Sequence, residues 1–459
     1  MNHNTKLKIT SLISLSLLTG CSAVSLQPLK SNIPAVFITP IQSKESLQLN
    51  PNWWLLFKDP TLNTFITHAL EHNSDLAIAI LNIKIAQNSL ALSKINGTPT
   101  QSLSTTFSAN KNLRTNEKSE SNSLNYSFNY ELDLWKSIES SENAKEWALR
   151  ASEQDKEITK LSLISSIISL YYKAIYLNET ISMVEQSVNY SKKLLSITET
   201  KFKVGKLSGL ELAQAKTSLI EQEYSLNEYK QNSFENLNAL KALLNLNPGD
   251  NFPNDLTIPE KIPPKIFKNI QSDIPSNILK NRPDVLAAQM RIQEAFYNVK
   301  IQEAEFYPKI SLTGSLGNST ADLLKFISNP IGSLAASIQL PILNYSQNKE
   351  NLRISEHKYN IYALEYQKIL TKAMEEVENR LSFYYYNKDN YEKIEQVFKE
   401  SQKIRKIYDV RYNAGVAPLQ DLLDAQERER KAYLNKLSHI YNLINSESQV
   451  YQALGGKYQ

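Results

Sequence analysis

The sequence predicts a mainly α-helical chain with a small β part, formed by duplication of one structural unit. The 459-residue chain carries similar motifs twice in the same order. Asp75 and Pro99, for example, recur as Asp284 and Pro308, 209 positions later. This spacing is far longer than the roughly 20–50 residues of a solenoid repeat, so we expect two large copies instead of an array.

Two further blocks of the chain repeat in nearly the same register. Tyr130–Trp135 matches Ile338–Leu343 at an offset of 208, and Gly205 matches Gly415 at an offset of 210. Three separated blocks in one order indicate a duplication of the whole unit. The first structural repeat is therefore placed at residues 61–273 and the second at residues 274–459.

The N-terminus predicts where the chain is sent. Lys6 and Lys8 precede a short apolar run that ends at Leu18, and Cys21 follows a small-residue cleavage point. This pattern is typical of a secretory signal, which we place at residues 1–20. It resembles a bacterial lipobox, so we expect Cys21 to be acylated, anchoring an N-terminal lipidated extension at residues 21–60 in membrane lipid. The alternative is an ordinary secretion signal with an incidental cysteine.

Composition excludes several classes of protein. The formal net charge is only +4, so nothing points to nucleic acid as a partner. Cys21 is the only cysteine, which leaves no internal disulfide. No segment after the signal approaches 18 consecutive apolar residues, so we expect no transmembrane helix.

Glycine and proline placement marks out long helices. Neither residue occurs between Pro99 and Gly205 or between Pro341 and Gly415. We expect long helices at 136–203 and 345–413; about 68 residues would rise roughly 100 Å. Helices at 209–246 and 418–454 return from the glycine turns, a helix at 284–306 opens the second repeat, and a proline-rich connector ends the first. Apolar residues spaced by three and four predict a coiled-coil seam on the first long helix: Leu161, Ile164, Ile168, Tyr171, Ile175, Ile181, Val184 and Val188.

Strands precede each long helix. From Leu124 to Leu134 apolar and polar residues alternate strictly, which is typical of a strand with one apolar face. We predict strands at about 100–110 and 123–134 in the first repeat, and at about 309–317 and 332–342 in the second. Such alternation suits a membrane β-barrel, and Trp135 at the strand end is an interfacial residue type. A half-buried sheet of a soluble domain would alternate in the same way.

Four strands cannot close a transmembrane barrel. An open sheet in lipid would leave backbone amides at its edges unpaired, at several kcal/mol each. The chain must therefore share a barrel with copies of itself, and we expect an obligate homo-oligomer.

Several short motifs together resemble the TolC-type outer-membrane factor family, in its lipidated branch. They are the lipobox, Trp53-Trp54 with Phe57–Pro60, Tyr130–Trp135, Arg282-Pro283-Asp284, Arg411-Tyr412 with Gly415, and Leu422–Gln426. The resemblance covers nearly the whole mature chain. Lys136 stands where this family usually has a glycine, and Leu343-Asn344-Tyr345 replaces a glycine-containing turn.

The resemblance implies a homotrimer in the bacterial outer membrane, with a 12-stranded β-barrel on an α-helical periplasmic barrel. It also implies a passive exit duct of a tripartite, RND-type efflux system, which would export drugs or other small toxic solutes. Its partners would be a periplasmic adaptor protein and an inner-membrane pump. The alternatives are the exit channel of a type I protein secretion system and a periplasmic coiled-coil scaffold or adaptor.

No residues point to an enzyme, a cofactor or a metal centre. His68 and His72 lie four residues apart on an expected helix, but no third ligand accompanies them. Four methionines and one cysteine provide no soft-ligand path for copper or silver. No phosphate-binding loop is present, so energy for transport must come from another protein.

The turns between the long helices are the candidate functional site. We expect Leu419, Asp421 and Asp424 to form the periplasmic gate, since an inward-facing acid becomes a ring of charges in a symmetric oligomer. Asp421 could instead be a helix N-cap or first-turn acid. Adaptor docking is predicted at the two turns, where the same residues could simply end and restart helices: Gly205, Ser208, Gly209, Gly415 and Pro418.

The remaining motif residues have expected structural roles. Trp53 and Trp54 should pack the N-terminal segment against the helices. Arg282, Pro283 and Asp284 should cap and brace the helix that opens the second repeat. Trp135 should lie at a membrane interface.

Overall fold

The computed structural model describes residues 52–456 except for residue 254 and residues 263–275 and 321–329. All described residues lie in one compact unit, residues 34–459. The described residues do not include the predicted signal peptide, Cys21, residues 22–51 of the N-terminal extension or residues 263–273 of the connector.

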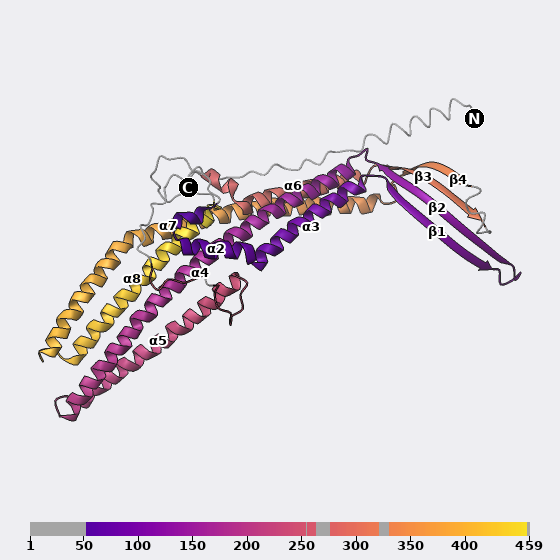
Figure 1. Cartoon of the computed structure of the whole chain (residues 1–459). Coiled ribbons are helices and arrows are strands. Elements are labelled where there is room, and N and C mark those ends of the chain that lie inside the picture. Colours follow the sequence, from indigo (N-terminus) through magenta and orange to yellow (C-terminus); the bar gives the residue numbers. More distant parts are fainter. Residues whose placement is uncertain (1–51, 254, 263–275, 321–329, 457–459) are drawn as a thin grey trace. The chain divides into compact units, whose positions relative to one another are not determined.

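The described elements occur in the same order twice, as the duplication predicts (Figure 1). The first copy contains α3 (Ser74–Asn96), β1 (Thr100–Lys111), β2 (Lys118–Leu132), α4 (Ser137–Lys203) and α5 (Gly209–Leu243). The second contains α6 (Pro283–Ala304), β3 (Lys309–Thr320), β4 (Ile331–Gln339), α7 (Tyr345–Asn413) and α8 (Leu419–Ala453). Two short 3-10 helices, η1 (Trp53–Phe57) and η2 (Ser276–Asn281), and helix α2 (Pro60–His72) complete the described elements.

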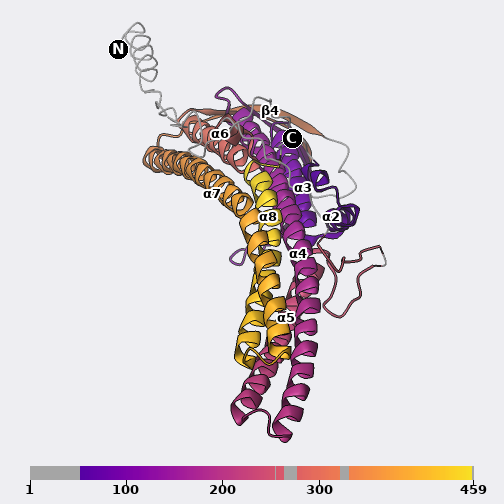
Figure 2. The same cartoon turned by 90° about the vertical axis from the view of Figure 1, so that its left-hand side faces the viewer.

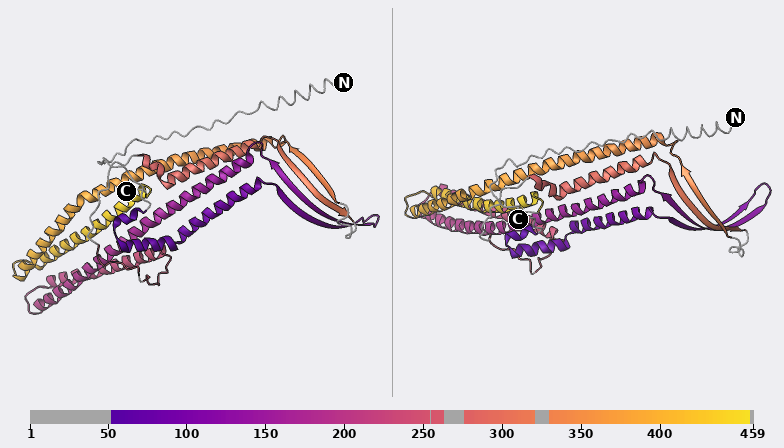
Figure 3. Two further views of the ribbon diagram at one scale, coloured as in Figure 1. Left: turned by 45° about the horizontal axis from the view of Figure 1, so that its top comes forward. Right: turned by 90° about the horizontal axis from the view of Figure 1, so that it is seen from above.

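Four helices lie side by side in the order α3, α4, α6, α7 (Figure 3). The strands continue from one end of this layer (Figure 3), and the α4–α5 and α7–α8 hairpins extend from the other (Figure 2). The strand β2 begins at Lys118, five residues before the expected start, because the loop after β1 is only a tight turn at 112–117. The predicted seam covers only one face of α4, whereas residues 163–177 are buried on several faces. The reason is that α2, α6 and α8 also pack against α4.

The strands form one antiparallel sheet in the order β1-β2-β3-β4. Its two faces differ in chemistry over the half of the sheet nearest the helices. Serine hydroxyls pair across the strands on one face, as in Ser102 with Ser127 (3.1 Å) and Ser311 with Ser337 (2.7 Å). The other face carries exposed apolar side chains, among them Leu103, Phe107, Tyr126, Phe128, Leu316, Leu334 and Ile338. The predicted alternation is therefore present in β2 from Leu124 to Leu132, and β4 ends at Gln339, three residues before its predicted end.

A glycine lies beneath an aromatic ring on the apolar face of this sheet. Gly314 lies opposite Phe128 in the register of β3 and β2. A Cβ at Gly314 would come within 2.2 Å of atoms of the Phe128 ring, so the ring covers the glycine backbone and would have to move to make space for a side chain.

The N-terminal aromatic residues are core residues, as expected. Trp53 is fully buried and stacks on Tyr451 of α8, with ring centroids 5.3 Å apart. Asp59 caps α2 by accepting a hydrogen bond from the Leu62 amide, and it accepts further bonds from the Tyr171 and Tyr172 hydroxyls. Burial, and then the negative charge of Asp59, raises the pKa of both tyrosines. These contacts join η1 and α2 to the middle of α4.

Arg282 is the centre of a buried network of hydrogen bonds and ion pairs. Its guanidinium bonds both oxygens of Asp284 (3.0 and 2.8 Å), the carboxylate of Glu376 in α7 (2.9 Å) and the carbonyl of Ala453 at the end of α8. Burial alone would lower the pKa of Arg282, but the bonds to Asp284 and Glu376 outweigh it and raise that pKa. The motif thus braces three helices, a wider role than capping α6.

Lys136 adopts a left-handed backbone conformation, which favours glycine. Its φ of 58° and ψ of 31° are left-handed, and the Asp133 carboxylate caps α4 by accepting from the amides of Ile138 and Glu139. Trp135 stacks on Tyr307 (4.6 Å) and donates to the Pro308 carbonyl, which fixes the same turn. Asn344 in the second copy has a φ of −99°, so no strain arises there.

Lys136→Gly is expected to raise the free energy of unfolding by about 0.5–1 kcal/mol, because a left-handed lysine costs about 1–2 kcal/mol and glycine removes this cost at some entropic expense. Lys193→Gly, at an exposed position inside α4, should lower it by about 1 kcal/mol. Thermal unfolding of the purified variants measures both changes. Equal destabilisation by the two substitutions would contradict this account of the turn.

One described helix, α3, is long and apolar enough to cross a membrane by length and composition alone. Only 11% of its most apolar window is buried within the chain. Its exposed apolar side chains include Ile78, Leu81, Ile85, Leu92 and Ile95. Because α3 lies at the free edge of the four-helix layer, these side chains mark a surface that a neighbouring molecule could cover.

Candidate functional site at the hairpin ends

Both hairpins turn through the same glycine-dependent motif. Gly205 and Gly415 have φ values of 73° and 75°, a conformation that favours glycine. In each turn the glycine amide bonds the carbonyl three residues back, and the next amide bonds the carbonyl five residues back. This pair of bonds is the Schellman motif, which satisfies the last carbonyls of α4 and α7. The duplication is therefore visible in the turn geometry.

The two hairpins restart their second helices differently. Ser208 caps α5 in a capping box, in which the Glu211 carboxylate accepts from the Ser208 amide at 2.9 Å. The hydrogen bond from Ser208 lowers the pKa of Glu211. Gly209 has helical backbone and no neighbour near its Cβ position, so neither packing nor strain requires glycine there. Ser208 and Glu211 therefore have a clear structural role in starting the helix.

In the second hairpin Pro418 is the N-cap of α8, without a side-chain hydrogen bond. Asp421 lies in the first turn of α8, so the N-cap interpretation of this residue is wrong and the first-turn interpretation holds. Asp424 is exposed and accepts a hydrogen bond from Gln420 at 2.8 Å. Asp421 is favourable near the positive end of the helix dipole, whereas Asp424 lies in the second turn, where this effect has fallen off.

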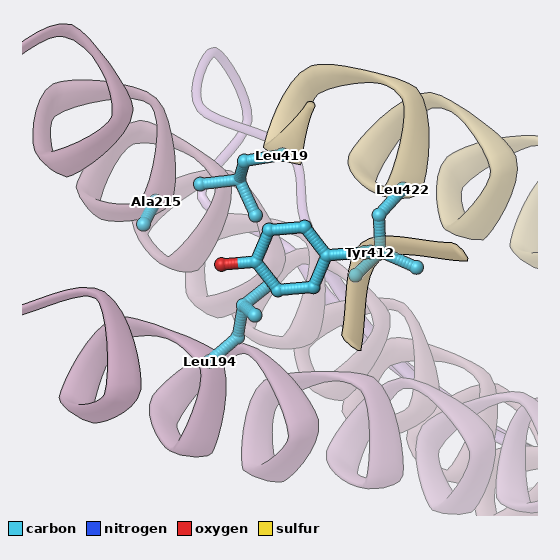
Figure 4. Packing of buried hydrophobic residues seen from close by; sticks show 5 residues of the cluster. All are labelled: Leu194, Ala215, Tyr412, Leu419 and Leu422. Carbon is cyan, nitrogen blue, oxygen red and sulfur yellow. The ribbon is translucent and has the colours of Figure 1, made fainter. Parts of the chain in front are cut away.

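Leu419 does not lie on a free surface of the chain, contrary to what an exposed gate residue requires. It is 2% exposed and packs in a cluster that joins the two hairpins (Figure 4). Leu194 and Ala215 come from the first hairpin, and Tyr412, Leu419 and Leu422 come from the second. We call these five residues the hairpin cluster. Burial of their apolar surface holds the hairpins together close to their ends.

Polar contacts between the hairpins continue away from the ends. The Tyr190 hydroxyl donates to the Asp409 carboxylate at 3.2 Å, joining α4 to α7. Burial, and then the Asp409 charge, raises the pKa of Tyr190 to about 12, so the hydroxyl keeps its proton at neutral pH. The Tyr433 hydroxyl of α8 donates to Glu179 of α4 at 2.9 Å. The ammonium group of Lys201 lies 4.6 Å from the centre of the Tyr412 ring.

A cavity of about 400 Å³ lies between these contacts, lined by residues of α4, α5, α7 and α8. Its walls are mostly polar. Arg430 forms a two-bond pair with Glu427 (2.7 Å each), and Arg405 pairs with Glu429 (2.7 Å). Although burial opposes ionisation, the bonds from Arg430 lower the pKa of Glu427. The interface between the hairpins is therefore apolar at the ends and polar in its middle.

These cross-hairpin partners were not found from the sequence. Tyr190, Asp409 and Tyr433 belong to no local motif, and their partners lie more than 200 residues away. Tyr412 could have been suspected from the duplication, because its counterpart Phe202 is also aromatic.

His68 and His72 of α2 belong to no metal-binding cluster in the described part of the chain. No group of three or more metal-ligating side chains occurs in that part. His68 and His72 stack on each other, with ring centroids 4.2 Å apart, and the ring of His72 is hydrogen-bonded to the His68 carbonyl.

Comparison with known proteins identifies the relatives of this chain. The family model "Outer membrane efflux protein" matches residues 65–246 and 274–456. "Toxin and drug export protein A" of Aggregatibacter actinomycetemcomitans is 34% identical over 410 residues, 89% of each chain. Among solved structures, the CmeC outer membrane channel of Campylobacter jejuni has a TM-score of 0.85 at 25% identity, covering 95% of this chain and 94% of CmeC. The open-state MtrE channel of Neisseria gonorrhoeae has a TM-score of 0.84 at 25% identity, covering 95% and 98%.

Proposed function

This chain belongs to the outer membrane efflux protein family and is an outer-membrane efflux channel, and we propose that three copies form one passive exit duct of a tripartite pump. The single observation that best supports assembly is that the sheet and the helix layer each have two free edges. The sheet ends at β1 and β4, and the helix layer ends at α3 and α7. Copies arranged around an axis would join β4 to β1 and α7 to α3, closing both layers together.

The exposed apolar side chains fit this assembly. α3 carries six exposed large apolar side chains, and α7 carries Ile354, Ile361 and Leu364 with about half or more of each side chain exposed. A free monomer would expose these long apolar edges to water, which is unfavourable. The apolar face of the sheet would contact lipid, and the serine face would line a polar interior.

The assembled duct would perform no chemistry of its own. A periplasmic adaptor would dock on the hairpin ends near Gly205, Ser208, Gly209, Gly415 and Pro418, where both turns are exposed. An inner-membrane pump would supply the energy. We further propose that Cys21 is acylated and that the mature chain is anchored through it in outer-membrane lipid.

We propose drugs or other small toxic solutes as the cargo, since the relative with 34% identity is named a toxin and drug export protein. The first word of that name also keeps a second function open, the exit channel of a type I protein secretion system. The scaffold interpretation is disfavoured because it gives no role to the two-faced sheet.

Chemical crosslinking of the purified full-length chain tests the assembly. The ladder of crosslinked species is expected to end at three chains, in detergent and in lipid vesicles alike. A chain that stays monomeric at every crosslinker concentration would overturn the proposal.

The double variant Asp421→Ala/Asp424→Ala is expected to raise the single-channel conductance in planar bilayers. Each substitution removes a ring of three carboxylates from the proposed gate at the hairpin end of the trimer. Glu211→Ala is the matched control, since Glu211 occupies the position of Asp421 in the first copy and its carboxylate bonds Ser208. It should weaken the start of α5 without raising conductance. Unchanged conductance of the double variant would remove these acids from the gate.

A further inference from the structure

We propose that the far end of the sheet carries a binding site for lipid phosphate groups, formed by Lys111, Arg114 and Lys118. Lys111 and Lys118 are directly paired across β1 and β2, and Arg114 lies in the turn between them. Like charges placed opposite each other on neighbouring strands repel and destabilise a sheet. A bound anion between them would turn that repulsion into attraction.

No acid in the described part of the chain compensates these cations by an ion pair. Glu117 accepts a hydrogen bond from the Thr115 hydroxyl at 3.1 Å, and Glu120 is paired across the strands with Ala109. All three basic residues are exposed. The site therefore has charge and access, and it lacks a partner within the chain's described residues.

The strand register shows which face of the sheet carries the two lysines. Lys111 is four residues beyond Phe107 and eight beyond Leu103, so all three share one face of β1. On β2 that face carries Lys118, Glu120, Asn122, Leu124, Tyr126 and Phe128. Glu120 is thus the neighbouring acid on this face, and no ion pair joins it to either lysine among the described residues. The lysine pair thus stands on the apolar face, beyond its last large apolar side chains.

The position of the lysine pair along the strands indicates which kind of phosphate it would bind. This inference rests on the proposed function, in which the apolar face contacts lipid and the helices lie in the periplasm. The turn at 112–117 is then at the outer surface, since β1 and β2 join α3 and α4 at their opposite ends (Figure 1). Four residues of a tilted strand rise roughly 10 Å, which lifts Lys111 from the acyl region to the phosphate groups of the outer leaflet. Lysine ammonium groups bind phosphate readily.

Lipid titration tests this site with the full-length protein in phosphatidylcholine vesicles that contain increasing fractions of phosphatidic acid. Each added fraction should raise the melting temperature of the crosslinkable trimer. In the Lys111→Gln/Lys118→Gln variant the half-saturating fraction of phosphatidic acid should rise at least fivefold, since one lysine near a charged surface contributes about that factor. The Lys111→Arg/Lys118→Arg variant should keep the response.

Lys193→Gln/Lys216→Gln is the matched control, because both lysines are exposed on the α4–α5 hairpin, away from the sheet and from the proposed contact between α7 and α3. It should respond like the unmodified chain. An unchanged response of the Lys111/Lys118 glutamine variant would overturn the site. Equal stabilisation by inorganic phosphate in pure phosphatidylcholine would also overturn it, in favour of a soluble anion. Failure of the proposed function has a different signature, the loss of the trimer in every lipid.

Discussion

Arg282→Ala is expected to lower the free energy of unfolding by about 3 kcal/mol, the low end of the range for breaking a buried ion pair. The Arg282 side chain is only 9% exposed, and its removal leaves Asp284 and Glu376 without their shared cation. It also frees the Ala453 carbonyl, so the end of α8 loses its contact with α6. Thermal and denaturant unfolding of the purified protein measure the loss.

Arg291→Ala provides the comparison for Arg282. Arg291 pairs with Asp155 at 2.5 Å, but both side chains are more than a third exposed. Solvent screens such a pair, which typically contributes less than about 1 kcal/mol. Similar losses for the two variants would show that Arg282 acts only as a surface charge and would contradict its role as a brace.

Leu419→Ala is expected to loosen the hairpin ends. Leucine-to-alanine changes in packed cores cost about 2–5 kcal/mol, and we expect about 2 because the cluster lies at a helix end that can partly collapse. The effect should appear as faster proteolysis at the lysines of the first turn, Lys203 and Lys206. A higher channel conductance should accompany it, since the hairpin cluster joins the two hairpins of each chain.

Leu210→Ala is the matched control at the other hairpin end. Leu210 is 65% exposed and does not belong to the hairpin cluster, so its truncation should change neither proteolysis nor conductance. If Leu419→Ala also leaves both unchanged, the hairpin cluster does not hold the closed end.

Local patterns in the sequence were sufficient to predict the elements. Helix-compatible composition without glycine or proline marked α4 and α7, and strict alternation marked β2, because these signals depend only on neighbouring residues. The duplication then predicted the second set of strands. The turn at 112–117 was predicted too long, because polar residues in β2 before Leu124 carry no apolar alternation.

Contacts between the two copies could not be predicted in the same way. Phe202 and Tyr412 occupy equivalent positions, yet Phe202 is 41% exposed and Tyr412 is 7% exposed. Gly209 likewise corresponds to the buried Leu419. The second copy thus supplies the side chains that pack against the first, and a single sequence does not reveal which copy will do so. For the same reason the burial of Leu419, which was predicted as a gate residue, could not be foreseen.

The measurement that tests the account most directly is crosslinking in intact cells, followed by purification through a C-terminal tag and mass spectrometry of the attached proteins. The account predicts a periplasmic adaptor and an inner-membrane transporter attached to trimers of this chain. A proton-driven transporter would support export of small solutes, and an ATP-driven one would favour protein secretion. Recovery of the chain with neither an adaptor nor a transporter would contradict its role as an exit duct.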